Sequence, residues 1–185
     1  KFEGEDSTLE VGDRTIVREF CTLHRGTRDK KITKIGSDCL LMAYSHVAHD
    51  VVIGDNVIVS ISVNIAGHAE IDDYAIIGGC TPVHQFCKIG KHSFIGGGRL
   101  ILQDVPPYIL ATGEPLRYAG INSVGLRRRK FSLSSRSQIK KAYSLIYQSE
   151  LNISQAVKKI RNDFDSSDEI NVILEFIERS DRGII

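Results

Sequence analysis

Residues 35–101 read IGSDCLLMAYSHVAHDVVIGDNVIVSISVNIAGHAEIDDYAIIGGCTPVHQFCKIGKHSFIGGGRLI, and this stretch decides the fold. An aliphatic residue recurs there at every sixth position without a miss: Ile35, Leu41, Val47, Ile53, Val59, Ile65, Ile71, Ile77, Val83, Ile89, Ile95 and Ile101. A fixed period of six is the signature of a parallel β-helix, in which three hexads, about 18 residues, close one triangular coil. The repeat therefore predicts a shaft of stacked coils with these side chains inside.

The side chain four residues after each aliphatic residue must also fit inside the coil. Its occupants are all small or β-branched, as a pleated and packed surface prefers: Cys39, Ser45, Val51, Val57, Val63, Ala69, Ala75, Thr81, Cys87 and Ser93. Glycine often follows the aliphatic directly, as in Gly36, Gly54 and Gly78, and we expect it to serve the backbone angles of the corners. A sandwich of short strands is the alternative fold, but it gives no reason for a repeat that stays in phase.

The hexads divide the chain into a β-helix over residues 1–108 and a linker with a helical domain over residues 109–185. The run TRDKK (27–31) interrupts the pattern, with Asp29 at an inward position, and predicts an extruded loop at about 27–34 near the binding face. The two prolines of QDVPPY (103–108) are expected to end strand pairing. Because the chain starts on Lys1 in mid-pattern, we also expect further coils before it.

Beyond the linker, the apolar period changes from six to 3.6 residues, which predicts amphipathic helices. The second helix should begin after Asn152, with Gln155 three residues later, and the third after Ser166, with Glu169 three residues later in a capping box. We expect this helical domain to cap the last coil. The three helices are defined by these apolar groups: Ile139, Ala142 and Ile146; Ile153, Ala156, Val157 and Ile160; Ile170, Ile173, Leu174 and Ile177.

Composition excludes some partners. The net charge of +1 gives no case for nucleic acid, and no apolar run approaches the roughly 20 residues of a membrane span. Cys21, Cys39 and Cys87 fall at inward positions with Cys80 nearby, and no CxxC spacing is present. The four cysteines therefore indicate reduced core thiols in a cytoplasmic protein.

The histidines are the most informative polar residues. His92 falls on another face of the coil and is expected to be an ordinary surface residue, while His24 precedes the loop. Coils stack at about 4.8 Å, so in-phase side chains become neighbours along one edge. Four histidines fall within a few positions of one another in the 18-residue coil, and none of them is at an inward position: His46, His49, His68 and His84.

Two kinds of chemistry suit such a cluster, beside the alternative of scattered surface histidines. One is a base-catalysed transfer, in which a neutral imidazole takes a proton near pH 7. The other is a zinc site of three imidazoles, as in γ-class carbonic anhydrases, which share this β-helix. The His46-x-x-His49 spacing is narrower than that class uses, which argues mildly against zinc.

Six segments in this order resemble the acyl-carrier-protein-dependent UDP-N-acetylglucosamine O-acyltransferase family. They are SHVAHD (45–50), AGH (66–68), VHQFC (83–87), QDVPPY (103–108), GLRRR (125–129) and RSDRGII (179–185). The resemblance covers essentially the whole chain and is more specific than the hexad repeat. It implies a left-handed coil, a cytoplasmic homotrimer with active sites between the shafts, and no bound cofactor or metal. The implied reaction moves an (R)-3-hydroxyacyl group from acyl carrier protein to the 3-hydroxyl of UDP-N-acetylglucosamine, the first step of lipid A biosynthesis.

The same resemblance implies roles for individual residues. His49 would be the general base, Asp50 its support, and the backbone N–H of Gly67 the oxyanion donor. Gly97 would set acyl length by leaving room for a long chain. Val124 stands where an acidic residue is expected, so one nucleotide contact would be lost or replaced. The implied substrate contacts are His46, His68, His84, Gln85, Asn122, Arg128, Arg129, His24 and Lys1.

The basic run RRRK (127–130) suits a diphosphate or the acidic surface of acyl carrier protein. We expect it at the start of a helix, where basic side chains oppose the helix dipole, which favours a functional role. Three other functions stay open at this point: the N-acyltransferase that acts later in the same pathway, a γ-type carbonic anhydrase, and a non-catalytic scaffold that docks acyl carrier protein.

Overall fold

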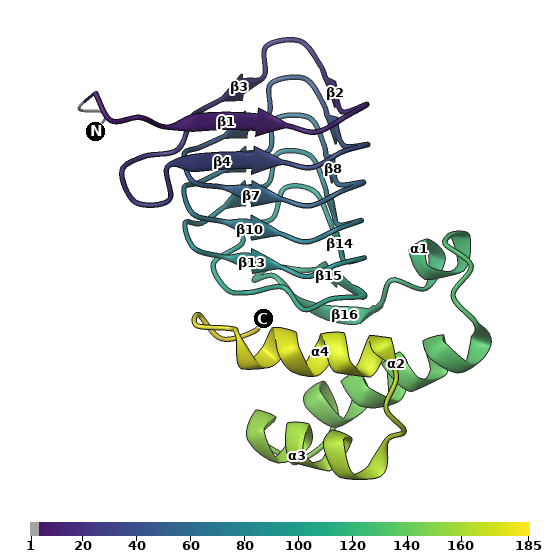
Figure 1. Ribbon diagram of the computed structural model, residues 1–185. Coiled ribbons are helices and arrows are strands. Elements are labelled where there is room, and N and C mark those ends of the chain that lie inside the picture. The colour runs from purple at the N-terminus through teal and green to yellow at the C-terminus, as the bar shows by residue number, and fades with distance from the viewer. Residues whose placement is uncertain (1–3) are drawn as a thin grey trace.

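The computed structural model describes residues 4–185 and shows the predicted left-handed parallel β-helix followed by helices (Figure 1). Lys1, a predicted substrate contact, lies outside the described residues. The first sheet contains β1 (Thr8–Val11), β4 (Ile32–Ile35), β7 (Val52–Ile53), β10 (Glu70–Ile71) and β13 (Lys88–Ile89). The second contains β2 (Ile16–Val17), β5 (Leu40–Leu41), β8 (Ile58–Val59), β11 (Ile76–Ile77), β14 (Phe94–Ile95), β15 (Ile109–Thr112) and β16 (Arg117–Ile121). The third contains β3 (Thr22–Leu23), β6 (His46–Val47), β9 (Asn64–Ile65) and β12 (Pro82–Val83).

The hexad pattern determines which residues fill the shaft. All twelve repeating aliphatic residues are buried, and so are all ten residues at the second inward position. Strands one coil apart pair in parallel register, as Val47 does with Ile65 and Ile53 with Ile71. Each inward methyl-bearing side chain therefore packs on its counterpart in the next coil, which removes a continuous apolar column from water.

The glycines that follow the aliphatic residues have a different role from the predicted one. The left-handed corner position is occupied by other residues, including Asp50 with φ +60° and His68 with φ +63°. A Cβ on Gly36 would instead lie 2.4 Å from the carbonyl oxygen of Gly54 in the next coil. The prediction of corner angles was wrong because these glycines allow adjacent coils to approach closely, while the corners tolerate side chains.

The end of the shaft also differs from the prediction. β15 lies just beyond Pro106 and Pro107, yet it pairs in parallel with β14, so the prolines do not stop the ladder. The chain then turns back as β16, which pairs with β15 antiparallel. The predicted loop, by contrast, is present as a turn-containing excursion between β3 and β4.

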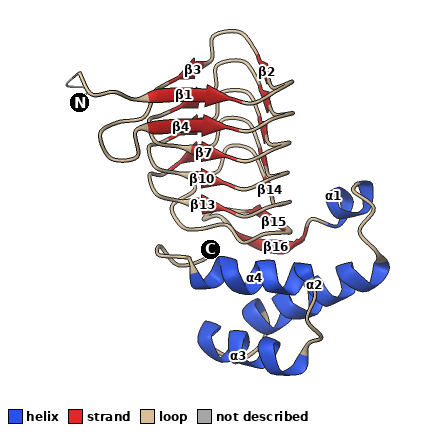
Figure 2. Cartoon of the chain, viewed as in Figure 1, coloured by secondary structure: helices blue, strands red, loops and turns tan. Residues whose placement is uncertain are grey.

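Four helices follow the strands; the first lies to the side of the last coils and the other three lie beneath them (Figure 2). They are α1 (Ser123–Arg128), α2 (Leu133–Tyr147), α3 (Ile153–Asp163) and α4 (Asp168–Glu178). The capping box of Asn152 and Gln155 is complete at α3. At α4 the cap is Ser167, whose side chain accepts from the N–H of Ile170, so the predicted cap at Ser166 was wrong by one residue.

Two further expectations concern the membrane and the thiols. No helix within residues 4–185 is long and apolar enough to cross a membrane. All four cysteines are free, with Cys39 and Cys87 buried and Cys21 half-buried. Cys80 is exposed, which corrects its assignment to the core, because it occupies an outward corner position.

Candidate active site

The site lies at the corner that connects the third sheet to the first, residues 48–51, 66–69 and 84–87, which we call the histidine corner. Because β6 and β9 pair in register, His49 stands beside Gly67, and Asp50 stands beside His68. The imidazoles of His49 and His68 meet edge to face at 5.2 Å between centroids, and His68 stacks on Phe86 at 4.6 Å. The structure therefore brings together two of the four histidines that the repeat placed in phase.

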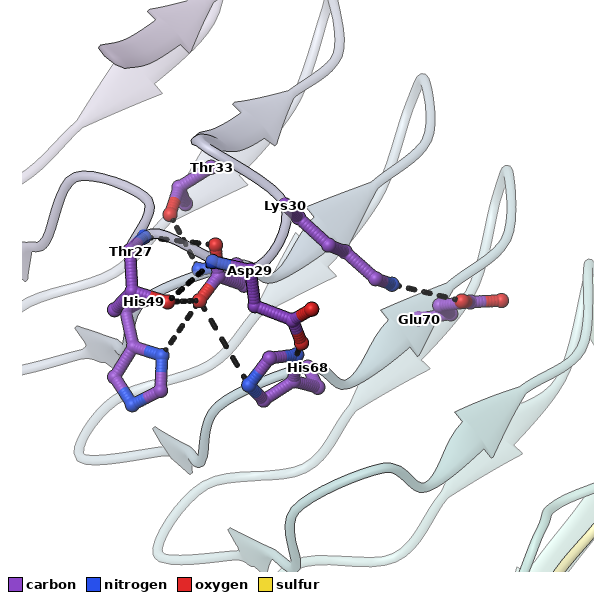
Figure 3. A network of polar contacts seen from close by, with 8 residues as sticks. Thr27, Asp29, Lys30, Thr33, His49, His68 and Glu70 are labelled. Atoms are coloured by element: carbon purple, nitrogen blue, oxygen red, sulfur yellow. Dashed lines mark hydrogen bonds and ion pairs between the residues drawn. The ribbon is translucent and has the colours of Figure 1, made fainter. Parts of the chain in front are cut away.

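Asp50 is the centre of a polar network, and its partners Thr27, Thr33 and His49 are labelled in Figure 3. Its side chain is fully buried, and its Oδ2 accepts a hydrogen bond from Nδ1 of His49 at 2.9 Å. The backbone N–H of Thr27 donates to Oδ1 at 2.8 Å, and the Thr27 hydroxyl donates to Oδ2 at 2.5 Å. The backbone N–H of Asp50 itself donates to the hydroxyl of Thr33 at 2.8 Å.

This network decides the charge of Asp50. Burial alone would raise the pKa of the carboxyl, but the hydrogen bonds from Thr27 and His49, together with nearby His68, outweigh burial and lower the pKa below its usual value. Asp50 is therefore an ionised acceptor at neutral pH. A carboxylate on Nδ1 holds the proton there and leaves Nε2 of His49 as the basic nitrogen.

Gly67 lies directly against that imidazole. A Cβ on Gly67 would be 2.7 Å from Cε1 and 3.0 Å from Nε2 of His49. Within residues 4–185 the N–H of Gly67 makes no hydrogen bond, while its carbonyl accepts from the N–H of Phe86. The His49 side chain is 44% exposed, so a ligand can reach the basic nitrogen, while Gly67 is buried beside it. The arrangement suits the removal of a proton beside a developing negative charge.

Comparisons with known proteins show which family the chain belongs to. Residues 104–185 match the family "Udp N-acetylglucosamine O-acyltransferase; Domain 2", and residues 32–60 match "Bacterial transferase hexapeptide". An acyl-[acyl-carrier-protein]–UDP-N-acetylglucosamine O-acyltransferase of Thiobacillus denitrificans is 42% identical over 186 residues, covering 100% of this chain and 72% of the relative. The chain belongs to the UDP-N-acetylglucosamine O-acyltransferase family. It is therefore an acyltransferase.

Solved structures of the family superpose on the whole chain. The UDP-N-acetylglucosamine acyltransferase from Bacteroides fragilis has a TM-score of 0.97 at 48% identity, covering 100% of this chain and 72% of that one. The Francisella novicida enzyme has a TM-score of 0.96 at 36% identity, covering 100% and 68%. The O-acyltransferase name of the Thiobacillus denitrificans relative favours oxygen over nitrogen as the acceptor.

Three other histidines of this acyltransferase, His24, His46 and His84, lie in or directly after strands of the third sheet. The His24 ring meets His46 at 4.8 Å, and the Thr22 hydroxyl lies 2.7 Å from Nδ1 of His46. Burial, and then His24, lowers the pKa of His46. His84 and Gln85 lie two coils further along the same corner, with Nδ1 of His84 3.1 Å from the carbonyl oxygen of Gln85.

The predicted nucleotide residues lie at a different corner, residues 72–75, 90–93 and 106–108, which we call the tyrosine corner. Asn122 caps α1 through the N–H of Gly125 and donates to the carbonyl of His92. Arg129 donates to the carbonyl of Tyr74 at 3.1 Å and covers its ring, leaving Nη1 buried without a partner. One chain therefore does not bring these two side chains to His49.

A groove of about 500 Å³ lies next to the tyrosine corner. Arg128 is exposed and lines it together with Val124 and the apolar side chains of Ile76 and Phe94. The basic run starts in the last turn of α1, not the first, so the expected opposition to the helix dipole was wrong. Its position is electrostatically favourable without any ligand, which removes the dipole argument for function.

Gly97, the predicted acyl-length position, is exposed and packs on the preceding coil. A Cβ there would lie 2.9 Å from the carbonyl oxygen of Gly79.

His92 is not the surface residue that its phase suggested. It is stacked between Tyr74 at 4.7 Å and Tyr108 at 5.6 Å, and burial lowers its pKa to about 4. Sequence phase placed His92 on the correct face but could not show that aromatic rings cover it.

The zinc alternative requires three imidazoles, which the described residues do not gather. The group with metal-ligand spacing consists of His49, Asp50 and His68, whose ligand atoms lie within 4.8 Å of one another. Both oxygens of Asp50 already accept hydrogen bonds, and one of the bonds to Oδ2 comes from His49 itself. The geometry therefore favours an acid–base pair over a three-imidazole zinc centre.

Sequence reasoning predicted an extruded loop near the binding face but not which of its residues reach the site. Thr27 binds the buried carboxylate, and the carboxylate of Asp29 lies 3.5 Å from Nδ1 of His68. Lys30 extends the network to Glu70 at 3.2 Å (Figure 3). The only signal was the misplaced Asp29, because the loop breaks the phase on which all the other positions were predicted.

Proposed function

We propose that this acyltransferase transfers an (R)-3-hydroxyacyl group from acyl carrier protein to the 3-hydroxyl of UDP-N-acetylglucosamine, the first step of lipid A biosynthesis. One observation carries the proposal: His49 has Nδ1 on a buried carboxylate and Nε2 free against the backbone of Gly67. An alcohol is a weak nucleophile, so a positioned base contributes about 10²–10⁴ in rate.

The proposed step is acyl transfer through a tetrahedral intermediate. Nε2 of His49 takes the proton of the sugar hydroxyl as its oxygen attacks the thioester carbonyl. The N–H of Gly67 binds the oxyanion, a contribution of about 10²–10³ in rate. The intermediate collapses by breaking the carbon–sulfur bond, and the imidazolium returns its proton to the departing thiolate. Asp50 stays ionised throughout and stabilises the imidazolium.

The substrate contacts divide between the two corners, which supports a homotrimer with active sites in the clefts between shafts. In this proposal, His24, His46, His68, His84 and Gln85 hold the sugar and phosphates on one subunit. Asn122, Arg128 and Arg129 reach the nucleotide from the neighbouring subunit. An arrangement of this kind explains why residues assigned to one ligand lie at different corners of one chain.

Other parts of the proposal follow from the donor. Acyl carrier protein brings the thioester on its own phosphopantetheine, so the chemistry needs no bound cofactor or metal. Arg128 and its basic neighbours suit the acidic donor protein. Gly97 is the proposed acyl-length position, on an exposed part of the shaft. The four free cysteines fit a reducing cytoplasm.

The proposal is tested by assaying purified protein with UDP-N-acetylglucosamine and a panel of acyl carrier protein thioesters. We expect O-acylated product from the wild type and none from His49→Ala, with an unchanged circular dichroism spectrum. Near-normal turnover by His49→Ala would rule out the base. Turnover only with an amino sugar acceptor would indicate an N-acyltransferase. Binding of acyl carrier protein without turnover would indicate a scaffold. Loss of activity on adding a chelator would indicate a zinc enzyme.

The shared site is tested by mixing subunits. His49→Ala and Arg128→Ala proteins, each impaired alone, are unfolded, mixed and refolded together. If one cleft takes His49 from one chain and Arg128 from another, mixed trimers regain activity. Mixed trimers that form but stay as impaired as the parents would show that each chain carries a complete site.

A further inference from the structure

The neck of the extruded loop is built to close tightly over Asp50. A Cβ on Gly26 would lie 2.1 Å from the backbone nitrogen of Ile32, so the two ends of the loop touch at this glycine. The N–H of Lys31 donates to the carbonyl of Thr27 at 2.7 Å, which closes a turn. The amide and hydroxyl of Thr27 are thereby both directed at the carboxylate of Asp50.

Thr27 supplies most of the hydrogen bonds that Asp50 receives. Within residues 4–185 this carboxylate accepts three hydrogen bonds: one from the backbone N–H of Thr27, one from the Thr27 hydroxyl and one from His49. A fully buried carboxylate without such donors loses its charge or its orientation, since burial of an unpaired charge is costly. The bond from His49 alone would leave Oδ1 of this buried carboxylate without a hydrogen bond from residues 4–185.

The tip of the loop contributes less. Lys30 and Glu70 form an ion pair at 3.2 Å, but their side chains are 38% and 32% exposed, and such pairs add little. Asp29 is 71% exposed, and its approach to His68 at 3.5 Å is not a hydrogen bond. The firm connection between the loop and the site is therefore Thr27.

We propose that Thr27 is a positioning residue for acyl transfer. Its amide and hydroxyl hold the Asp50 carboxylate in the orientation that directs Nε2 of His49 at the acceptor hydroxyl. This inference rests on the proposed function of His49 as the base. Thr27 does not itself act on the reacting atoms, so it affects the rate only through Asp50.

The first test compares Thr27→Val, which removes the hydroxyl at nearly constant shape, with Thr27→Ser, which keeps it. Thr15→Val is the matched control, because Thr15 is also half-buried and its hydroxyl donates to the carbonyl of Gly36 at 2.7 Å, far from the site along the coil. We expect kcat of Thr27→Val to fall about tenfold with KM changed by less than about twofold. Thr27→Ser and Thr15→Val should stay near the wild-type kcat.

The second test asks whether Thr27 acts through Asp50. Asp50→Asn lowers kcat on its own, and adding Thr27→Val to it should cause no further loss. Equal fold losses in both backgrounds, or a wild-type kcat for Thr27→Val, would overturn the proposal. If Thr27→Val does not fold, Thr27→Ala, which keeps the amide donor, takes its place in the same cycle. An active His49→Ala would instead overturn His49 as the base. The comparison of the Thr27 and Asp50 single and double variants would then show only whether Thr27 acts through Asp50.

Discussion

Replacing Gly67 by alanine places one methyl group against the proposed base and leaves the fold intact. The new Cβ would lie 2.7 Å from Cε1 of His49, whereas ordinary contacts begin at 3.4 Å, so the imidazole must move by about 0.7 Å. The backbone accepts a side chain at this position, because His49 and Gln85 occupy the equivalent places in the adjacent coils. A displacement of about 1 Å at a catalytic group costs about 100-fold in rate.

We therefore expect Gly67→Ala to lower kcat by about 100-fold while its melting temperature stays close to that of the wild type. Steady-state assays with a fixed acyl donor measure kcat, and circular dichroism measures unfolding. The internal control is Gly67→Ala in a His49→Ala background, where the colliding ring is gone and the melting temperature should match that of His49→Ala alone. Normal turnover by Gly67→Ala would refute the inferred contact between this glycine and the base. A large drop in melting temperature would show that Gly67 is needed for folding.

Three further predictions concern stability. The pKa of His92 is lowered by burial to about 4, so below about pH 6.5 the unfolded chain binds a proton that the folded chain does not. The free energy of unfolding should fall as the pH drops from about 6.5 towards 4 in the wild type, and fall less in His92→Phe, as urea titrations at several pH values will show. Asn152→Ala removes the capping box of α3 and should lower the free energy of unfolding by about 1 kcal/mol in the same assay. Gly78→Ala sets a methyl 2.4 Å from the backbone nitrogen of Gly97 and should cost about 3 kcal/mol, so a loss under 1 kcal/mol would contradict the close approach of the coils.

The shaft was predictable because its rule is local and repetitive. One inward aliphatic per hexad determined the phase of every strand from Ile35 to Ile101, and the structure buries each of these residues. The same rule could not show why glycine follows several of them, since the distance between coils is a property of the stack and not of one hexad. Beyond Pro107, where no hexad remains, neither β15 nor the antiparallel return of β16 could be predicted.

The candidate site was predictable only in part, for the same reason. The repeat placed His49 beside Gly67 and Asp50 beside His68 because these positions are separated by whole coils. Sequence phase alone could not separate His49 and His68, which meet, from His84, which follows a more distant strand of the same sheet. It also could not predict that Asn122 would cap a helix at another corner.

A regular coil can gather side chains but cannot by itself orient them. In-phase residues stand about 4.8 Å apart along one edge and project in the same direction, so they approach one another side by side. A buried carboxylate needs hydrogen-bond donors that point toward it from another direction, and a strictly regular coil does not supply such donors. The segment between β3 and β4 supplies them, because Thr27 lies against Asp50 where the chain leaves the coil, and the chain then turns at residues 28–30 and returns past Gly26. The break in the repeat is therefore the feature that turns a column of neighbouring side chains into an oriented acid–base pair.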